Sequence, residues 1–314
     1  MSLHEQLYQW TARQRLDAAS ARRLWQLSGV ERSPADLWTL LRRGTGAVAA
    51  GLIGFGVILW VAANWETLGR GTRFGLLQAL LFTSVAGAAT RPAWRAPLGL
   101  LSFLALGGVL AYFGQTYQTG ADSWCLFALW SGLALPLVIA IRSDLVWTPW
   151  VVVAGLAISL WTHTYAGRSW RFDPPTLTVH ALGLAATLLL ALAMAWRMAR
   201  TGQPWAWRMA VLSGTVFAAV LAVVALFSRQ VQPQFWLCLA LLAVGLSLAW
   251  WQREVYAMSV LALAVDVLLV ARITRGTSFS SLGGLLLIGG AATVLLAGSV
   301  HLILRRMRSV EATP

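Results

Sequence analysis

The sequence predicts an all-α, polytopic membrane protein with about ten transmembrane helices. Hydrophobic residues make up 58% of its 314 residues and charged residues only 11%, a composition that excludes an ordinary soluble domain. Most of the chain divides into apolar segments of about 17–25 residues, which is the length that an α-helix needs to cross a bilayer. Short polar breaks, most of which contain Arg, separate these segments, so each one is expected to be a membrane span.

Ten apolar spans follow a polar N-terminal region. We expect residues 1–43 to form a cytoplasmic helical headpiece, residues 44–304 the transmembrane domain, and residues 305–314 a basic cytoplasmic tail. The break between the eighth and ninth spans is the least marked. The predicted spans are 45–63, 73–90, 96–113, 124–141, 145–163, 177–196, 208–227, 234–251, 255–272 and 281–304.

The distribution of charge supports an N-in, C-in topology. All 24 basic residues are Arg, and most of them fall in segments that this topology places inside. The net charge of +13 does not indicate nucleic-acid binding, because the Arg residues are spread over many short loops. We therefore expect membrane lipids as partners and no nucleic acid. Ten spans also divide formally into two inverted halves of five, as in several transporters, but no residue-level similarity joins those halves.

The most concentrated run of hydrogen-bonding side chains in the apolar part of the chain is Gly114–Asp122. Lipid offers such groups no partner, so they must lie at a membrane surface, in a cavity or against another polar segment. The nearest such segment is Asn64-Trp65-Glu66, at the end of the first span. The topology places both segments at the outer surface.

Two interpretations fit these segments. In the first, their side chains line a polar pocket for a lipid head group, a sugar or a small solute. In the second, they are helix caps and loop hydrogen bonds that fix the first, third and fourth spans, and Asp122 is well placed to cap the fourth. The candidate binding residues are Asn64, Glu66, Gln115, Tyr117, Gln118 and Asp122.

Asp266 is the only acidic residue that the predicted spans place deep in the membrane. An intramembrane carboxylate is a candidate for proton coupling or substrate contact, and a structural hydrogen bond is the alternative. Arg272 lies six residues further along the same helix, which is too far round it for a pair. A partner for Asp266 is therefore expected on another span.

Catalytic and metal-binding patterns are absent from the sequence. His163, His180 and His301 lie singly near span ends, without the clustered ligands that a metal site requires. The chain has no Gly-rich phosphate loop, Ser–His–Asp grouping or paired catalytic carboxylates. We therefore expect no metal, no cofactor and no catalytic residue, and an enzyme is weakly supported.

Several of these motifs resemble a known family. The headpiece, the segment Val57–Glu66, and the run Gly114–Asp122 followed by Trp130 and Pro136 are similar to bacterial membrane proteins of domain-of-unknown-function family 2157. The AANWE and GQTYQTGAD motifs carry this resemblance, which covers roughly the first half of the chain. It implies a multi-pass protein of the bacterial inner membrane and gives no activity. In related proteins this region can be followed by further membrane segments or by a partner with a GDYxxLxY motif. If this chain needs such a partner, the resemblance implies that it is a separate membrane protein.

Three functions remain open. The first is transport, or lipid or solute handling, through an outer polar cavity between Asn64 and Glu66, the segment Gln115–Asp122, and Asp266. The second is a non-catalytic subunit that scaffolds a membrane assembly. The third, an intramembrane enzyme acting on a lipid-linked substrate, has the least support.

Overall fold

The computed structural model describes residues 8, 10, 11, 14, 16–28, 34–64, 66–117, 120–167, 176–228, 230–276 and 282–311. All regular structure in this part of the chain is helical, which confirms the predicted all-α class. The elements are α2 (Ala18–Leu27), α3 (Pro34–Ala63), α4 (Arg70–Thr90), the short 3₁₀ helix η1 (Pro92–Trp94), α5 (Arg95–Tyr117), α6 (Ser123–Ile141), α7 (Asp144–Tyr165), α8 (Thr176–Thr201), α9 (Trp205–Phe227), α10 (Pro233–Gln252), α11 (Val255–Gly276) and α12 (Leu282–Glu311).

Nine segments of the described chain are long and apolar enough to cross a membrane. They are Gly44–Ala63 within α3, the segment Pro92–Tyr117 that joins η1 and α5, and the helices from α6 to α12. A polytopic membrane protein is therefore confirmed, although the predicted span 73–90 is not among the nine. The corresponding helix α4 contains Arg70, Arg73 and Gln78, which lower its mean hydropathy.

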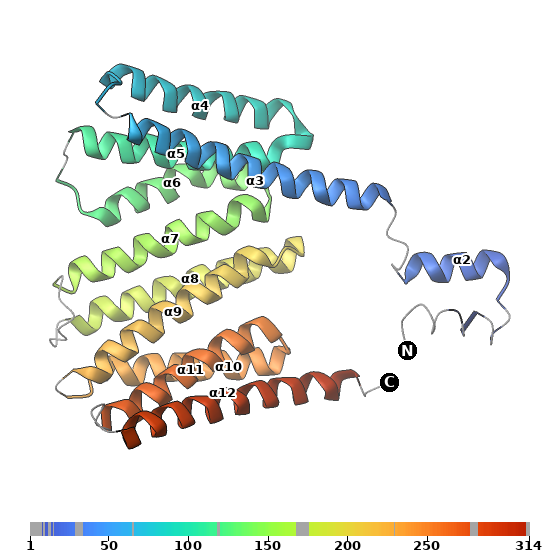
Figure 1. The fold of residues 1–314 in the computed structure, drawn as a ribbon, viewed down its shortest axis with the longest axis vertical. Helices are drawn as coiled ribbons and strands as arrows, with labels where there is room; N and C mark the ends of the chain where they lie inside the picture. The colour runs from blue at the N-terminus through green and yellow to red at the C-terminus, as the bar shows by residue number, and fades with distance from the viewer. Residues whose placement is uncertain are drawn as a thin grey trace.

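Helix α4 nevertheless packs along α5 at one end of the bundle (Figure 1). The Ser102 hydroxyl donates to Ser84 Oγ at 2.9 Å between the two helices. The Tyr112 hydroxyl donates to the Arg70 carbonyl at 3.0 Å. Interhelical hydrogen bonds of this kind help to hold membrane helices together, because in lipid no hydrophobic effect drives the helices to associate.

The helices from α3 to α12 alternate in direction, so the bundle has two faces where the helices end (Figure 1). We call one the terminal face: α2, the start of α3 and the end of α12 lie there, with the α6–α7 and α8–α9 connections. We call the other the opposite face, where α3 ends and α4 begins. Helix α3 is continuous and extends beyond the bundle toward α2, so the boundary predicted after residue 43 falls inside it.

The packing of the first helices recurs four helices later. In the first unit α5 is central and contacts α3, α4, α6 and α7; in the second, α9 is central and contacts α7, α8, α10 and α11. The pairs α3–α4, α6–α7 and α7–α8 recur as α7–α8, α10–α11 and α11–α12. A shift of four helices preserves their direction, so this packing repeat is parallel. It differs from the inverted five-plus-five division considered from the sequence.

Short sequence similarities accompany the packing repeat. The stretch from Gly54 to Leu59-Trp60 in α3 has the same spacing as Gly155 to Leu160-Trp161 in α7. The tripeptide Ala93-Trp94-Arg95 leads into α5, and Ala206-Trp207-Arg208 begins α9. In addition, α6 and α10 both end at an Arg in the left-handed conformation, Arg142 with φ 57° and Arg253 with φ 59°. These similarities are separated by four helices and therefore do not align the inverted halves.

Trp130 joins α5 to α6 in the first unit. Its Nε1 donates to the Phe103 carbonyl at 3.0 Å, and its ring stacks on that of Phe103 with centroids 5.0 Å apart. A Cβ added at Gly107 would lie only 2.4 Å from Trp130 Cζ2. The absence of a side chain at Gly107 therefore allows the indole to reach across to α5.

We predict that Gly107→Ala destabilises the protein by about 1–3 kcal/mol, because the added methyl group displaces the Trp130 indole. The matched control is Gly132→Ala, since a Cβ at Gly132 meets nothing within 4 Å. Denaturant unfolding of the detergent-solubilised protein measures both variants. Equal stability of the two would contradict this packing.

Candidate functional site

The first sequence-predicted motif lies at the opposite face, where α3 ends. Asn64 Nδ2 donates to the Trp60 carbonyl at 2.9 Å, and the Asn64 carbonyl accepts from Leu68 N at 3.1 Å. Asn64 thus closes the last turn of α3, as a C-terminal cap does. Glu66 is exposed.

The second motif lies at the same face, where α5 ends and α6 begins. Gln115 and Tyr117 are exposed, and the Tyr117 ring packs beside Phe113 with centroids 4.6 Å apart. Gln118 lies outside the described residues. Asp122 occupies the predicted N-cap position of α6 and accepts from Cys125 N through its backbone carbonyl at 2.9 Å, without a side-chain capping bond.

The two motifs are therefore brought to one face by the packing of α3 on α5. Among the residues that the structure describes, no hydrogen bond joins Asn64 or Glu66 to Gln115 or Tyr117, and Asn64 Nδ2 donates within α3. The exposed side chains of Glu66, Gln115 and Tyr117 face the surroundings at the membrane boundary.

Asp266 lies far from these motifs. It is halfway along α11, which contacts α9, α10 and α12 at the other end of the stack of helices (Figure 1). Its side chain is 8% exposed, and its Oδ1 accepts from the Ser299 hydroxyl of α12 at 3.0 Å. In the described part of the chain, Oδ2 is buried without a hydrogen-bond partner. The expected partner on another span is thus Ser299, and Asp266 does not join the outer polar segments in one cavity.

A groove of about 430 Å³ lies between α7, α8 and α9. This volume falls within the range of about 300–1,000 Å³ that is usual for small-molecule sites. Its walls are almost entirely apolar, and its rim includes four exposed aliphatic side chains. The rim residues are Val152, Leu156, Val216 and Val220. In a bilayer such side chains face lipid, so the groove is open sideways to the membrane.

Polar side chains gather at the end of the groove nearest the opposite face. Thr162 and His163 come from the last turns of α7, and His180 from the second turn of α8. Thr162 and His180 are only 2% and 6% exposed. The Thr162 hydroxyl donates to the Ile158 carbonyl at 2.8 Å, so its oxygen keeps only acceptor capacity toward a molecule in the groove.

The groove carries three further hydroxyls. Ser159 of α7 donates to the Gly155 carbonyl at 2.9 Å, Thr187 of α8 to the Leu184 carbonyl at 2.9 Å, and Ser213 of α9 to the Ala210 carbonyl at 3.1 Å. All three hydroxyl protons are used within their own helices. The middle of the groove therefore offers weak polarity along an apolar wall, which suits a hydrocarbon chain better than a sugar or an ion.

Sequence reasoning missed this groove. The predicted spans 145–163 and 177–196 already placed His163 and His180 near the same membrane surface, but each was treated as a single interfacial residue. The packing of α9 against both helices is what turns them into one site. That packing is part of the repeat of helix contacts, whose sequence signal is limited to a few short similarities.

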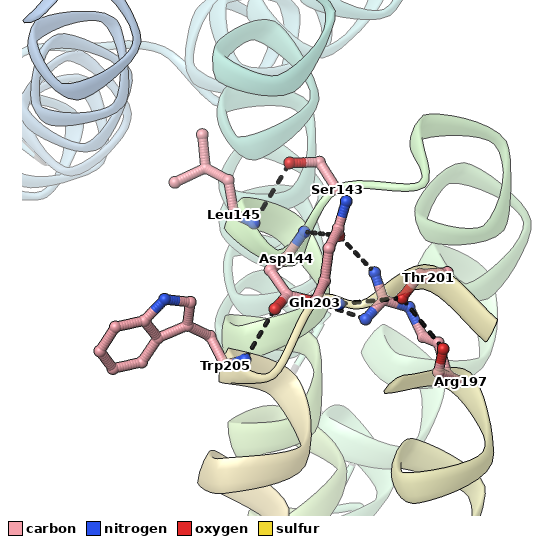
Figure 2. Close-up of polar contacts among 7 residues, drawn as sticks. All are labelled: Ser143, Asp144, Leu145, Arg197, Thr201, Gln203 and Trp205. Atoms are coloured by element: carbon pink, nitrogen blue, oxygen red, sulfur yellow. Dashed lines mark hydrogen bonds and ion pairs between the residues drawn. The ribbon is translucent and has the colours of Figure 1, made fainter. Parts of the chain in front are cut away.

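An ion-pair cluster ties the same three helices together at the terminal face (Figure 2). Asp144 begins α7, and its Oδ1 lies 2.5 Å from Nη1 of Arg197 in α8. Asp144 Oδ2 accepts from the backbone N of Trp205, the first residue of α9, at 2.7 Å. Gln203 Oε1 accepts from Arg197 Nη2 at 2.9 Å and from Asp144 N at 3.0 Å.

This cluster is buried as well as connected. The side chains of Arg197 and Asp144 are 9% and 13% exposed, and the Arg197 guanidinium lies 4.9 Å from the centre of the Trp147 ring. Each charged group has its counter-charge and additional hydrogen bonds, which is the condition for tolerating a buried ion pair. The cluster fixes the ends of α7, α8 and α9 at the terminal face. Its side chains bond to other groups of the protein. We therefore treat it as structural support for the groove.

The fold and these sites define a multi-pass, all-α membrane protein. Residues 8–147 match the family model described as predicted membrane protein (DUF2157). This match confirms the resemblance carried by the AANWE and GQTYQTGAD motifs and gives no activity. It ends in the first turn of α7, before Val152, so all the residues that line the groove lie outside it. No curated protein and no solved structure matches the chain.

We predict that Arg197→Gln lowers the free energy of unfolding by about 3–5 kcal/mol, because it leaves the Asp144 carboxylate buried without its counter-charge. The control is Arg200→Gln, which removes an exposed Arg that packs over Trp196 and should cost less than about 1 kcal/mol. Unfolding in mixed detergent, followed by Trp fluorescence, measures both. A double-mutant cycle with Asp144→Asn should give a large coupling energy, and additive effects would show that the pair does not hold the helices.

Proposed function

We propose that the protein binds an amphipathic membrane lipid in the groove between α7, α8 and α9, and that its function is lipid handling. The observation that carries this proposal is the combination of an apolar groove of about 430 Å³, open sideways between aliphatic rim residues, with a polar end at Thr162, His163 and His180. Such a groove offers an acyl chain an apolar wall and offers a head group or its ester linkages hydrogen-bonding partners.

The dimensions of the groove support a lipid. It extends along α7 from Val152 to Ala166, which is about 21 Å at 1.5 Å per residue. Half of the hydrocarbon thickness of a bilayer is about 15 Å. An acyl chain that enters from the leaflet at the opposite face can therefore lie along most of the groove while its head stays near the histidines.

The polar motif residues belong to this proposal as contacts at the same face. Glu66, Gln115 and Tyr117 are exposed near the membrane boundary, where they can meet lipid head groups. Asp266 is not among the residues that line the groove and stays a separate candidate for proton coupling. With the topology proposed from the Arg distribution, the polar end of the groove faces the outside of a bacterial inner membrane.

We predict that Ser213→Leu reduces lipid retention about tenfold or more, because the larger side chain occupies the middle of the groove. The matched control is Ser247→Leu: Ser247 is an exposed residue of α10 whose hydroxyl also donates to a carbonyl of its own helix, at 2.8 Å. Native mass spectrometry of protein released from phosphatidylethanolamine and phosphatidylglycerol nanodiscs counts the lipids that remain bound.

Retention of lipid by wild-type protein and Ser247→Leu, with loss in Ser213→Leu, is the expected result. Thermal unfolding of the variants checks that the fold is intact. Equal retention by all three proteins would refute lipid binding in the groove.

A second candidate function, the scaffold subunit, is favoured by helix α12. Its apolar segment Gly283–Met307 has no buried residue, and among the described helices α12 packs chiefly on α11. A Cβ at Gly289, Gly290 or Gly298 would meet nothing within 4 Å. Small residues of this kind let another membrane helix approach closely. A stoichiometric second membrane protein in the purified particle would support this candidate, and purification as a stable single chain would count against it.

A further inference from the structure

We infer that a second site, at the terminal face between α3 and η1, binds the head group of an anionic phospholipid. The site is a pocket of about 470 Å³ lined by residues that include Trp38, Arg42, Thr45, Gly46 and Trp94. It lies at the membrane boundary, because the apolar segments of α3 and of η1–α5 begin at Gly44 and Pro92. This site is separate from the groove, whose polar end is at the opposite face.

The pocket has the chemistry that recognises a lipid phosphate. Arg42 supplies a guanidinium whose planar fork matches phosphate oxygens, and Thr45 supplies a hydroxyl. The described residues that line the pocket include no acid. Arg91 and Arg95 flank η1 and are both exposed, so further positive charge is held nearby. Clusters of Arg beside a membrane span attract anionic lipids.

Two indoles give the pocket its membrane-facing walls. The Trp38 side chain is 72% exposed and that of Trp94 is 43% exposed. Trp prefers the head-group region, where its ring is apolar and its N–H meets polar groups. Helix α3 comes close to η1 beneath them, since a Cβ at Gly46 would lie 3.3 Å from Trp94 Cζ3 and 3.1 Å from Pro97 Cγ.

The second packing unit can be compared residue by residue with the pocket between α3 and η1. Gly54 of α3 aligns with Gly155 of α7, so Gly46 corresponds to Trp147. The two Ala-Trp-Arg tripeptides align Trp94 with Trp207. In the second unit, Trp207 is only 8% exposed, and Trp147 packs against the same apolar core. There the Arg197 guanidinium lies over Trp147 and is neutralised by Asp144.

By the same alignment of α3 with α7, Arg42 corresponds to Ser143, the residue before Asp144. The first unit therefore has an open space and a guanidinium where the second unit has the Trp147 ring and the start of α7. A phosphodiester bound beside Arg42 gives that guanidinium a counter-charge, as Asp144 does for Arg197 of α8 in the second unit. The acyl chains of the same lipid can lie along the exposed side of α3, which includes Val48 and Leu52. A membrane lipid meets both requirements, whereas a free phosphate ion meets only the first.

The test is native mass spectrometry of full-length protein released from nanodiscs that contain phosphatidylglycerol and phosphatidylcholine. Arg42→Gln should lower the retention of phosphatidylglycerol about tenfold, the effect of losing one charge-assisted contact. Thr45→Leu, which fills the pocket and keeps Arg42, should lower it as well. The charge-matched control is Arg305→Gln, an exposed Arg of α12 near the same face, which should retain the lipid as wild type does.

Each outcome separates this site from its alternatives. Loss of phosphatidylglycerol in Arg42→Gln and Thr45→Leu, with retention in both Arg305→Gln and Ser247→Leu, supports a head-group site at the pocket between α3 and η1. Equal retention by Arg42→Gln and wild type would overturn the proposal. Displacement of the lipid by millimolar inorganic phosphate would also overturn it, because the pocket would then bind a free anion. Loss of phosphatidylglycerol in both Arg42→Gln and Arg305→Gln would also overturn the proposal, because the protein would then attract anionic lipid through its overall charge.

Discussion

The structure depends on the ion pair between Asp144 and Arg197 at the terminal face. Asp144 begins α7, Arg197 lies near the end of α8, and the same carboxylate accepts from the backbone of Trp205 at the start of α9. Two charges buried in this way are stable only when they meet each other and further hydrogen bonds. Their geometry therefore fixes three helix ends at the terminal face, while the polar end of the groove lies at the opposite face.

The parallel packing repeat explains why the groove lies in the second unit. In the first unit α3 meets α5 closely: a Cβ at Gly54 would lie 2.9 Å from Leu104 Cδ1, and one at Gly108 would lie 3.0 Å from Ile58 Cγ1. At the corresponding position of the second unit, a Cβ at Gly155 would have only ordinary contact with Ser213, at 3.5 Å. The smaller neighbour leaves space. The two units thus share the same pattern of helix contacts and differ in the side chains that lie between the helices.

Much of the fold was predictable from the sequence, because lipid requires every spanning segment to satisfy its own backbone. The helical class and most helix limits followed from apolar length, and α4 departed from the hydropathy pattern through Arg70 and Arg73. The site was less predictable. The sequence singled out Asp266 and the Gly114–Asp122 run because polar residues stand out there, whereas the groove depends on mostly apolar side chains such as Val216. Asp144 was overlooked because its partner Arg197 is distant in sequence.

The central claim is that the groove between α7, α8 and α9 holds a lipid. The most direct measurement is an electron cryo-microscopy map of the full-length protein in nanodiscs made from its native membrane. We expect continuous elongated density along α7, from the end of the groove at His180 toward Met209. The Asp144–Arg197 pair should be intact at the terminal face. A groove closed by its own side chains, or one filled only by water while lipid density lies elsewhere, would contradict the account.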